Sequence, residues 1–127
     1  MRYFTWCLFL SLPCFATSVL CAEEPIRVSL VQLIANPEKY DGKVVFVVGF
    51  VSLEFEGSAI YLHEEDYKHA LYRNGLWIDI PNDMRRREAG VDRKYVMIIG
   101  TFNAKELGHK GAWSGSIQKI TKFRVRD

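Results

Sequence analysis

Cysteine is confined to one end of this sequence. Cys7, Cys14 and Cys21 all lie in the N-terminal segment, and no cysteine follows them. If that segment is removed, the remaining chain can form no disulfide and holds no thiol nucleophile or zinc-thiolate site. We therefore expect residues 23–127 to be held together by packing and hydrogen bonds alone.

A strong net charge is also missing. Without Arg2, 16 basic and 15 acidic side chains remain, which leaves a net charge of +1. Such a balance gives no general attraction to nucleic acid or anionic lipid. The charges are nevertheless unevenly placed, with acidic residues gathered at 54–66 and basic residues gathered at 85–94 and 110–126. Charge runs of this kind usually indicate solvated faces.

The sequence shows no combination of acid, base and nucleophile that would indicate an enzyme. Ser114 and Ser116 lack the G-x-S-x-G pattern and precede an expected strand rather than a helix. His63 and His69 are six residues apart, whereas a helical zinc motif places its histidines four apart. An acidic surface loop is the better interpretation of residues 63–69. We expect no catalytic residues, no metal and no cofactor.

The N-terminus has the order of a secretory signal peptide. Arg2 precedes an apolar run from Tyr3 to Leu20, and Ala22 precedes a charged stretch. This pattern predicts cleavage after Ala22, with cleavage after Ser18 as the weaker alternative, and a periplasmic or secreted protein without a membrane span. Two alternatives stay open. A run of about 18 apolar residues approaches the length of a membrane anchor, and Cys21 is placed for lipidation.

Residues 23–127 have the length of one domain and contain no linker or low-complexity tract. The domain begins with a predicted helix, because Ser29 and Gln32 have the spacing of a capping box. Leu30, Leu33 and Ile34 share one helical face, and Asn36-Pro37 ends the helix.

Two long β-type runs, Val44–Phe55 and Lys94–Gly100, contain Gly49 and Gly100, and each glycine falls six residues after a lysine. A glycine in a long strand allows the bend that a small closed barrel requires. Two short strands are predicted at residues 59–62 and 76–80, and a last strand at residues 115–126 with a bulge between Ile117 and Ile120.

Two short helices are expected between these strands. Residues 64–70 favour a helical turn, and residues 84–89 favour a helix capped by Asn82 or Asp83 and closed by Gly90. The predicted order is therefore helix, three strands, short helix, two strands. This order matches the five-stranded OB-fold, so we expect an all-β fold: an OB-fold-like Greek-key barrel preceded by an N-terminal helix.

With these elements placed, the chain resembles exported bacterial OB-fold proteins of the tRNA_anti-like type, which are mostly uncharacterised. The residues that carry the resemblance are the runs Val47–Phe50, Ile60–Leu62, Ile99–Phe102, His109–Gly111 and Ser114–Ile117. The likeness covers roughly residues 29–125. It implies a fold and a style of binding, and it names no ligand.

OB-folds bind ligands on the face of their second and third strands and on the loops beside it. The residues expected near that region are Tyr61, Arg73, Trp77, His109, Lys110 and Trp113. Trp77 alternates with Leu76 and Ile78 and lies either on the outer face or beneath the N-terminal helix. Arg85, Arg86 and Arg87 point in different directions on a helix, which favours a solvated helix over a binding patch.

These observations predict a non-catalytic, exported binding module that recognises a protein partner or an extended polymer such as a glycan. One alternative is a domain that binds single-stranded nucleic acid, which would require basic and aromatic residues to converge on one groove. A second alternative is a structural protein of the cell envelope.

Overall fold

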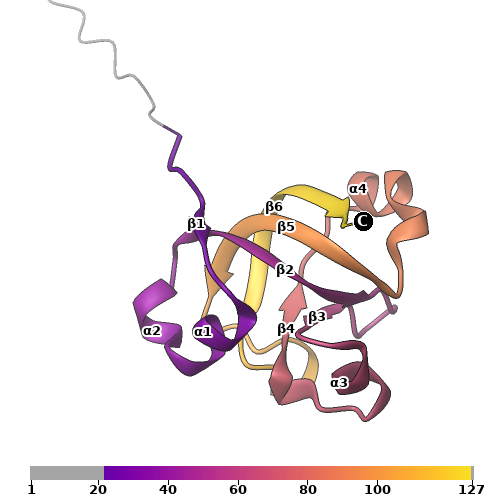
Figure 1. The fold of residues 1–127 in the computed structure, drawn as a ribbon, viewed down its shortest axis with the longest axis horizontal. Coiled ribbons are helices and arrows are strands. Elements are labelled where there is room, and N and C mark those ends of the chain that lie inside the picture. The colour runs from indigo at the N-terminus through magenta and orange to yellow at the C-terminus, as the bar shows by residue number, and fades with distance from the viewer. Residues whose placement is uncertain (1–21, 127) are drawn as a thin grey trace, which may run out of the picture.

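The computed structural model describes residues 22–126 (Figure 1). The predicted signal peptide, including Cys21, lies outside the described residues except for Ala22. Within the described part, the chain is mostly β-structure with only short helices. The predicted all-β class is therefore confirmed.

Five strands close into a barrel, as predicted. They are β2 (Val44–Ser52), β3 (Ala59–Tyr61), β4 (Gly75–Ile78), β5 (Lys94–Asn103) and β6 (Ser116–Val125). The hydrogen-bonded order is β2-β3-β4-β6-β5, and β5 pairs with β2 to complete the circle. Neighbours are antiparallel except β4 and β6, which are parallel. This arrangement has the connectivity of an OB-like barrel.

The N-terminal helix forms where the sequence predicts it. α1 (Leu30–Ala35) is opened by the Ser29 hydroxyl, which accepts the Gln32 backbone N–H at 3.2 Å, while the Gln32 side chain accepts the Ser29 backbone N–H at 3.0 Å. Leu30 and Leu33 are fully buried. Two neighbours were not predicted from the sequence: β1 (Ile26–Arg27), parallel to β2, and α2 (Pro37–Tyr40).

The remaining helices are short and lie in the connections between strands. They are α3 (Glu64–Lys68), α4 (Asn82–Arg87) and the 3-10 turns η1 (Tyr72–Asn74), η2 (Ala89–Val91) and η3 (His109–Gly111). The predicted cap of α4 is wrong. Pro81 occupies the N-cap because its carbonyl accepts the Arg85 N–H at 2.9 Å, while Asp83 lies within the first turn and pairs with Arg87.

The first long strand is shorter than predicted, because β2 ends at Ser52 rather than Phe55. The Asp92 carboxylate accepts the Leu53 backbone N–H at 2.8 Å. The Leu53 N–H therefore bonds to a side chain and not to the backbone of a neighbouring strand. Residues 53–58 then form a turn, closed by the Ser58 hydroxyl, which donates to the Glu54 carbonyl at 2.9 Å. Phe55 lies at this turn and not in a strand.

The predicted bulge in the last strand is confirmed. β6 pairs with β5 in one register at Thr101 and Gln118 and in another at Ile99 and Lys122. Between these two registers, residues 119–121 of β6 lie opposite Gly100 alone, and Lys119 among them has a left-handed φ of 48°. The barrel turns at this bulge, where the Gly100 backbone lies close to Ile117.

The other glycine predicted to shape the barrel, Gly49, lies where β2 crosses β3 and α1. A methyl group at this position would lie 2.5 Å from the Tyr61 carbonyl oxygen, 2.7 Å from Ile60 Cγ1 and 2.8 Å from Leu30 Cδ1. All three contacts involve backbone or fully buried core side chains, so none of these groups can move cheaply. Gly49 therefore lets the helix close against the barrel.

We expect Gly49→Ala to lower the free energy of unfolding by about 1–3 kcal/mol, because the added methyl overpacks a close contact. Urea unfolding followed by circular dichroism measures this change. Gly90→Ala is the matched control, since nothing lies within 4 Å of a methyl group there. Equal stabilities for the two variants would contradict the role assigned to Gly49.

Candidate functional site

The outer face of β3 and β4 carries aromatic side chains. The register pairs Ala59 with Trp77 and Tyr61 with Gly75, so Trp77 and Tyr61 share one face. Ile60 and Leu76 face the barrel core. Trp77 therefore lies on the outer face and not beneath α1, which resolves the two alternatives that the sequence leaves open.

Trp113 folds back over this face from the loop that joins β5 to β6. Its indole Nε1–H donates to the Tyr61 hydroxyl at 3.2 Å, and only 5% of Trp113 and 1% of Tyr61 is exposed. The Trp77 ring meets the Trp113 ring edge-on, with centroids 5.1 Å apart. A second apolar cluster, separate from the barrel core, results. Tyr61 and Trp113 therefore form a rigid floor rather than freely exposed platforms.

Two glycines make room for this aromatic layer. A methyl group at Gly75 would lie 2.6 Å from Tyr61 Cδ1, and one at Gly108 would lie 2.6 Å from Trp77 Cε3. Gly108 also has a φ of +70°, a conformation that side chains disfavour. The backbone of Gly75 in β4 therefore packs against the Tyr61 ring, and the backbone of Gly108 in the β5–β6 loop packs against the Trp77 ring.

Arg73 holds the loop that carries Trp113. Its guanidinium donates to the Trp113 carbonyl at 2.9 Å, and its own carbonyl accepts the Ser114 hydroxyl at 2.7 Å. The loop also joins the sheet directly, because the Trp77 N–H donates to the Gly115 carbonyl at 2.9 Å. Arg73 therefore acts on the site by positioning this loop. The Ser114 hydroxyl shares the same task.

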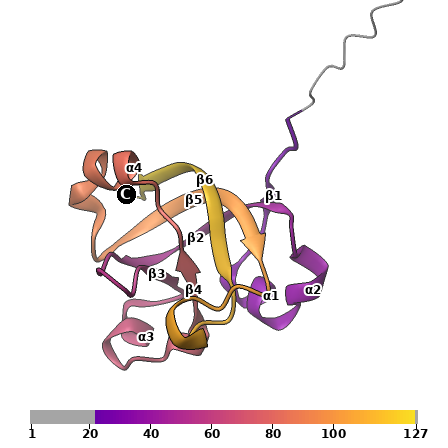
Figure 2. The ribbon, with the colours of Figure 1, turned by 180° about the vertical axis from the view of Figure 1, so that it is seen from behind.

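A hollow of about 520 Å³ lies over the aromatic floor. Its walls come from three connections: residues 54–57 after β2, Tyr67 and Tyr72 from the segment between β3 and β4, and residues 109, 110, 112 and 113 after β5. In both ribbon views the last of these connections lies beside α3 and β4 (Figures 1 and 2). The Tyr67 hydroxyl donates to Glu54 Oε1 at 2.9 Å, which ties two of the walls together.

Two further hollows adjoin this one. The first, about 510 Å³, shares Phe55, Glu56 and His109 with it and continues over Trp77. The second, about 490 Å³, shares Tyr72, Lys110 and Ala112 with it and continues along residues 70–74. We call the three together the groove, with a Trp77 end and an Arg73 end. A groove of three linked hollows suits an extended ligand better than a compact one.

All six residues predicted to lie near a ligand line this groove. Tyr61, His109, Lys110 and Trp113 line the central hollow, and Trp77 and Arg73 line the two outer ones. Whether these residues contact a ligand stays a prediction.

Sequence reasoning missed the two most exposed aromatic residues of the groove, Phe55 and Tyr72. The Phe55 side chain is 96% exposed at the tip of its turn, and Tyr72 is 44% exposed with its ring 5.2 Å from that of Trp113. The pattern of alternating residues assigned Phe55 to a strand. The signal that indicates otherwise is Gly57-Ser58, which begins two residues after Phe55 and is a pair typical of turns.

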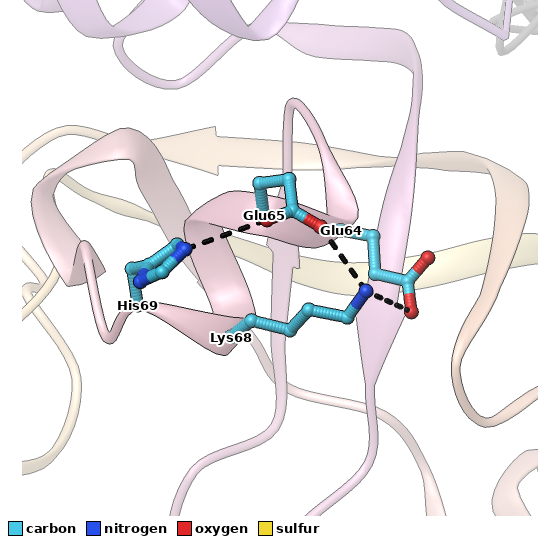
Figure 3. Close-up of polar contacts among 4 residues, drawn as sticks. All are labelled: Glu64, Glu65, Lys68 and His69. Carbon is cyan, nitrogen blue, oxygen red and sulfur yellow. Dashed lines mark hydrogen bonds and ion pairs between the residues drawn. The ribbon is translucent and has the colours of Figure 1, made fainter.

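The acidic segment around α3 is a self-paired surface helix (Figure 3). Lys68 Nζ lies 3.2 Å from a Glu64 oxygen and 3.1 Å from a Glu65 oxygen, and His69 Nε2 lies 3.4 Å from the other Glu65 oxygen. The Lys68 ammonium lowers the pKa of Glu65, chiefly through their hydrogen bond, and Glu65 in turn raises the pKa of Lys68. These groups face one another and not the groove.

The described residues contain neither a cluster of metal-ligating side chains nor a helix of membrane-spanning type. Across residues 22–126, no three His, Cys, Asp or Glu side chains gather as a metal site would require. The same stretch contains no helix with the length and apolar character needed to cross a bilayer.

Tyr61 gives the aromatic floor a pH signature, because burial raises the pKa of its phenol to about 12. The folded state thus favours the neutral phenol, and the stability this provides is full below the unfolded pKa of about 10 and lost as the pH rises toward 12. We expect Tyr61→Phe to cost about 1–3 kcal/mol at neutral pH, since the buried Trp113 Nε1–H loses its acceptor.

The difference in unfolding free energy between wild type and Tyr61→Phe should then narrow between pH 10 and pH 12. Urea unfolding at a series of pH values measures it. A difference that stays constant over this range would show that Tyr61 titrates alike in both states and would contradict its burial.

Comparison with protein-family models, with curated proteins and with solved structures finds no match to this chain. The resemblance to tRNA_anti-like proteins therefore rests on the sequence motifs alone. The fold itself is established by the strand pairing: a closed five-stranded OB-like barrel with an aromatic groove over β3 and β4.

Proposed function

We propose that this protein is a non-catalytic binding module that holds an extended ligand, a segment of a partner protein or a polymer such as a glycan, in the groove. The observation that carries this proposal is the run of three linked hollows over an aromatic floor. The groove lies on the face of the second and third barrel strands, between the loops that OB-folds use for oligomeric ligands.

The groove offers both rigidity and contact area. Tyr61 and Trp113 are fixed by their hydrogen bond, so binding costs them little conformational entropy. Phe55 and Tyr72 expose their rings at the rim, where a base, sugar or side chain can stack. An aromatic pair on such a ring contributes about 0.5–1.5 kcal/mol beyond its buried area, and a stacked base about 1–3 kcal/mol.

Charge disfavours a nucleic-acid ligand. Four carboxylates line the groove, from Glu54, Glu56, Asp79 and Glu106, against the cations of Arg73 and Lys110. Single-strand binders instead combine aromatic residues with a positively charged groove that follows the phosphates. A protein segment or glycan suits this lining better.

We also propose that the protein is exported. The N-terminal sequence pattern supports a periplasmic or secreted protein of the tRNA_anti-like type, processed near Ala22. In that location the domain would meet envelope polymers and exported proteins rather than nucleic acids.

Intrinsic fluorescence tests the proposal, because Trp77 and Trp113 both line the groove. The probes are chitohexaose, a heptalysine peptide, a heptaglutamate peptide and an oligo-dT strand. We expect a glycan or peptide probe to change the fluorescence saturably. Phe55→Ala and Tyr72→Ala should each weaken that binding about fivefold or more, since each removes a stacking surface.

Tyr95→Ala is the control, because Tyr95 is also an exposed aromatic residue, at 40%, but does not line the groove. Binding that all three variants weaken equally would contradict the proposed site. Tight binding of oligo-dT that weakens with salt would support the nucleic-acid alternative instead.

A further inference from the structure

The charges of the groove are divided between its ends, and from this division we infer the chemistry of the ligand. We propose that the groove binds an extended polypeptide segment with basic side chains, and that its ammonium or guanidinium groups lie in the hollow at the Trp77 end. This inference rests on the proposed function and names the class of ligand.

The hollow at the Trp77 end is lined by three carboxylates, those of Glu56, Asp79 and Glu106. Among the described residues that line it, His109 is the one basic side chain, and its Nε2 lies 4.0 Å from Glu56 Oε2. The carboxylates come from three different segments: the turn after β2, the end of β4 and the loop after β5. The fold therefore brings like charges together around one space.

An aromatic wall accompanies these carboxylates. Trp77 is half-buried and lines the same hollow, with its ring set by Gly108 and Trp113. An indole face attracts a cation through its quadrupole, and tryptophan does so most strongly of the aromatic residues. A cation in this hollow can thus contact the Trp77 indole and up to three carboxylates, whereas the same carboxylates repel an anion.

The Arg73 end has the opposite charge. Lys110 lines both the central hollow and the hollow at this end, where Arg73 is the other cation. Lys110 is exposed, whereas the Arg73 guanidinium is engaged with the Trp113 carbonyl. A segment with basic groups along its whole length would be attracted at one end and repelled at the other. We therefore expect the positive charge of Lys110 to weaken the binding of such a segment.

A basic polypeptide suits this lining better than a neutral glycan. Carboxylates gathered around one hollow repel one another, and a cation relieves that repulsion, whereas a hydroxyl group only exchanges one hydrogen bond for another. A polypeptide can also carry apolar side chains, which can pack on the exposed rings of Phe55 and Tyr72. Electrostatic complementarity of this kind selects partners and steers their encounter.

The experiment measures fluorescence anisotropy of labelled heptalysine with the mature protein, with labelled chitohexaose and heptaglutamate as the neutral and acidic probes. The triple variant E56Q/D79N/E106Q removes the carboxylate charges and keeps the amide oxygens as acceptors. We expect it to weaken heptalysine binding about tenfold, because several exposed ion pairs are lost together. Raising the salt concentration should weaken wild-type binding in the same direction.

A variant of equal net charge is the control. E23Q/E24Q/E38Q neutralises three exposed carboxylates outside the groove, at the N-terminus and on α2. It should leave heptalysine binding within about twofold of wild type, because solvent and salt screen exposed carboxylates that do not line the groove. Lys110→Glu should tighten heptalysine binding a few-fold, while Lys43→Glu, exposed outside the groove, should not.

Equal weakening by the two triple variants would overturn the inference, because general attraction would then explain the binding. Chitohexaose binding that Phe55→Ala weakens, together with no binding of heptalysine, would also overturn it, but would leave the proposed function intact. If Phe55→Ala and Tyr72→Ala change the binding of no probe, the proposed function fails as well.

Discussion

The hydrogen bond between Trp113 and Tyr61 is the interaction on which the groove depends. The β5–β6 loop is a long excursion from the barrel, and the Arg73 guanidinium and the Trp77–Gly115 backbone hydrogen bond hold it at its C-terminal end. By donating to the Tyr61 hydroxyl, the indole turns that loop back over β3 and β4 and buries both side chains. The position of His109 and Lys110, four and three residues earlier, follows from this anchor.

The other walls are fixed to the same floor. Tyr67 packs against Tyr61, with ring centroids 6.1 Å apart, and donates to Glu54, so the turn after β2 is tied to the segment between β3 and β4. Arg73 ties that segment to the carbonyl of Trp113. Three connections that are separate in sequence therefore share one support. A site built this way is positioned by packing and hydrogen bonds rather than by the loops themselves.

The sequence is informative about the barrel because its signals are local. The capping box at Ser29 and Gln32, the alternation of apolar residues and the strand glycines Gly49 and Gly100 each indicate an element without knowledge of the rest. The end of β2 is different. It is set by the Asp92 carboxylate, 39 positions further along the chain, and no local pattern indicates that contact. The alternating pattern therefore extends the predicted strand to Phe55, three residues beyond its end at Ser52. No periodic pattern marks Tyr72, which lies in the 3-10 turn η1 with its ring beside Trp113.

The acidic run at residues 54–66 shows why charge patterning alone does not locate a ligand site. Read as one run, it indicates a solvated face. In the structure, Glu64 and Glu65 are paired with Lys68 on α3, whereas Glu56 is carried by the turn after β2 to join Asp79 and Glu106 in the groove. A net charge near zero thus conceals a groove with a strongly acidic end. Because attraction between exposed charges falls off over about 8–10 Å, this local surplus, and not the net charge, decides which ligands the groove attracts.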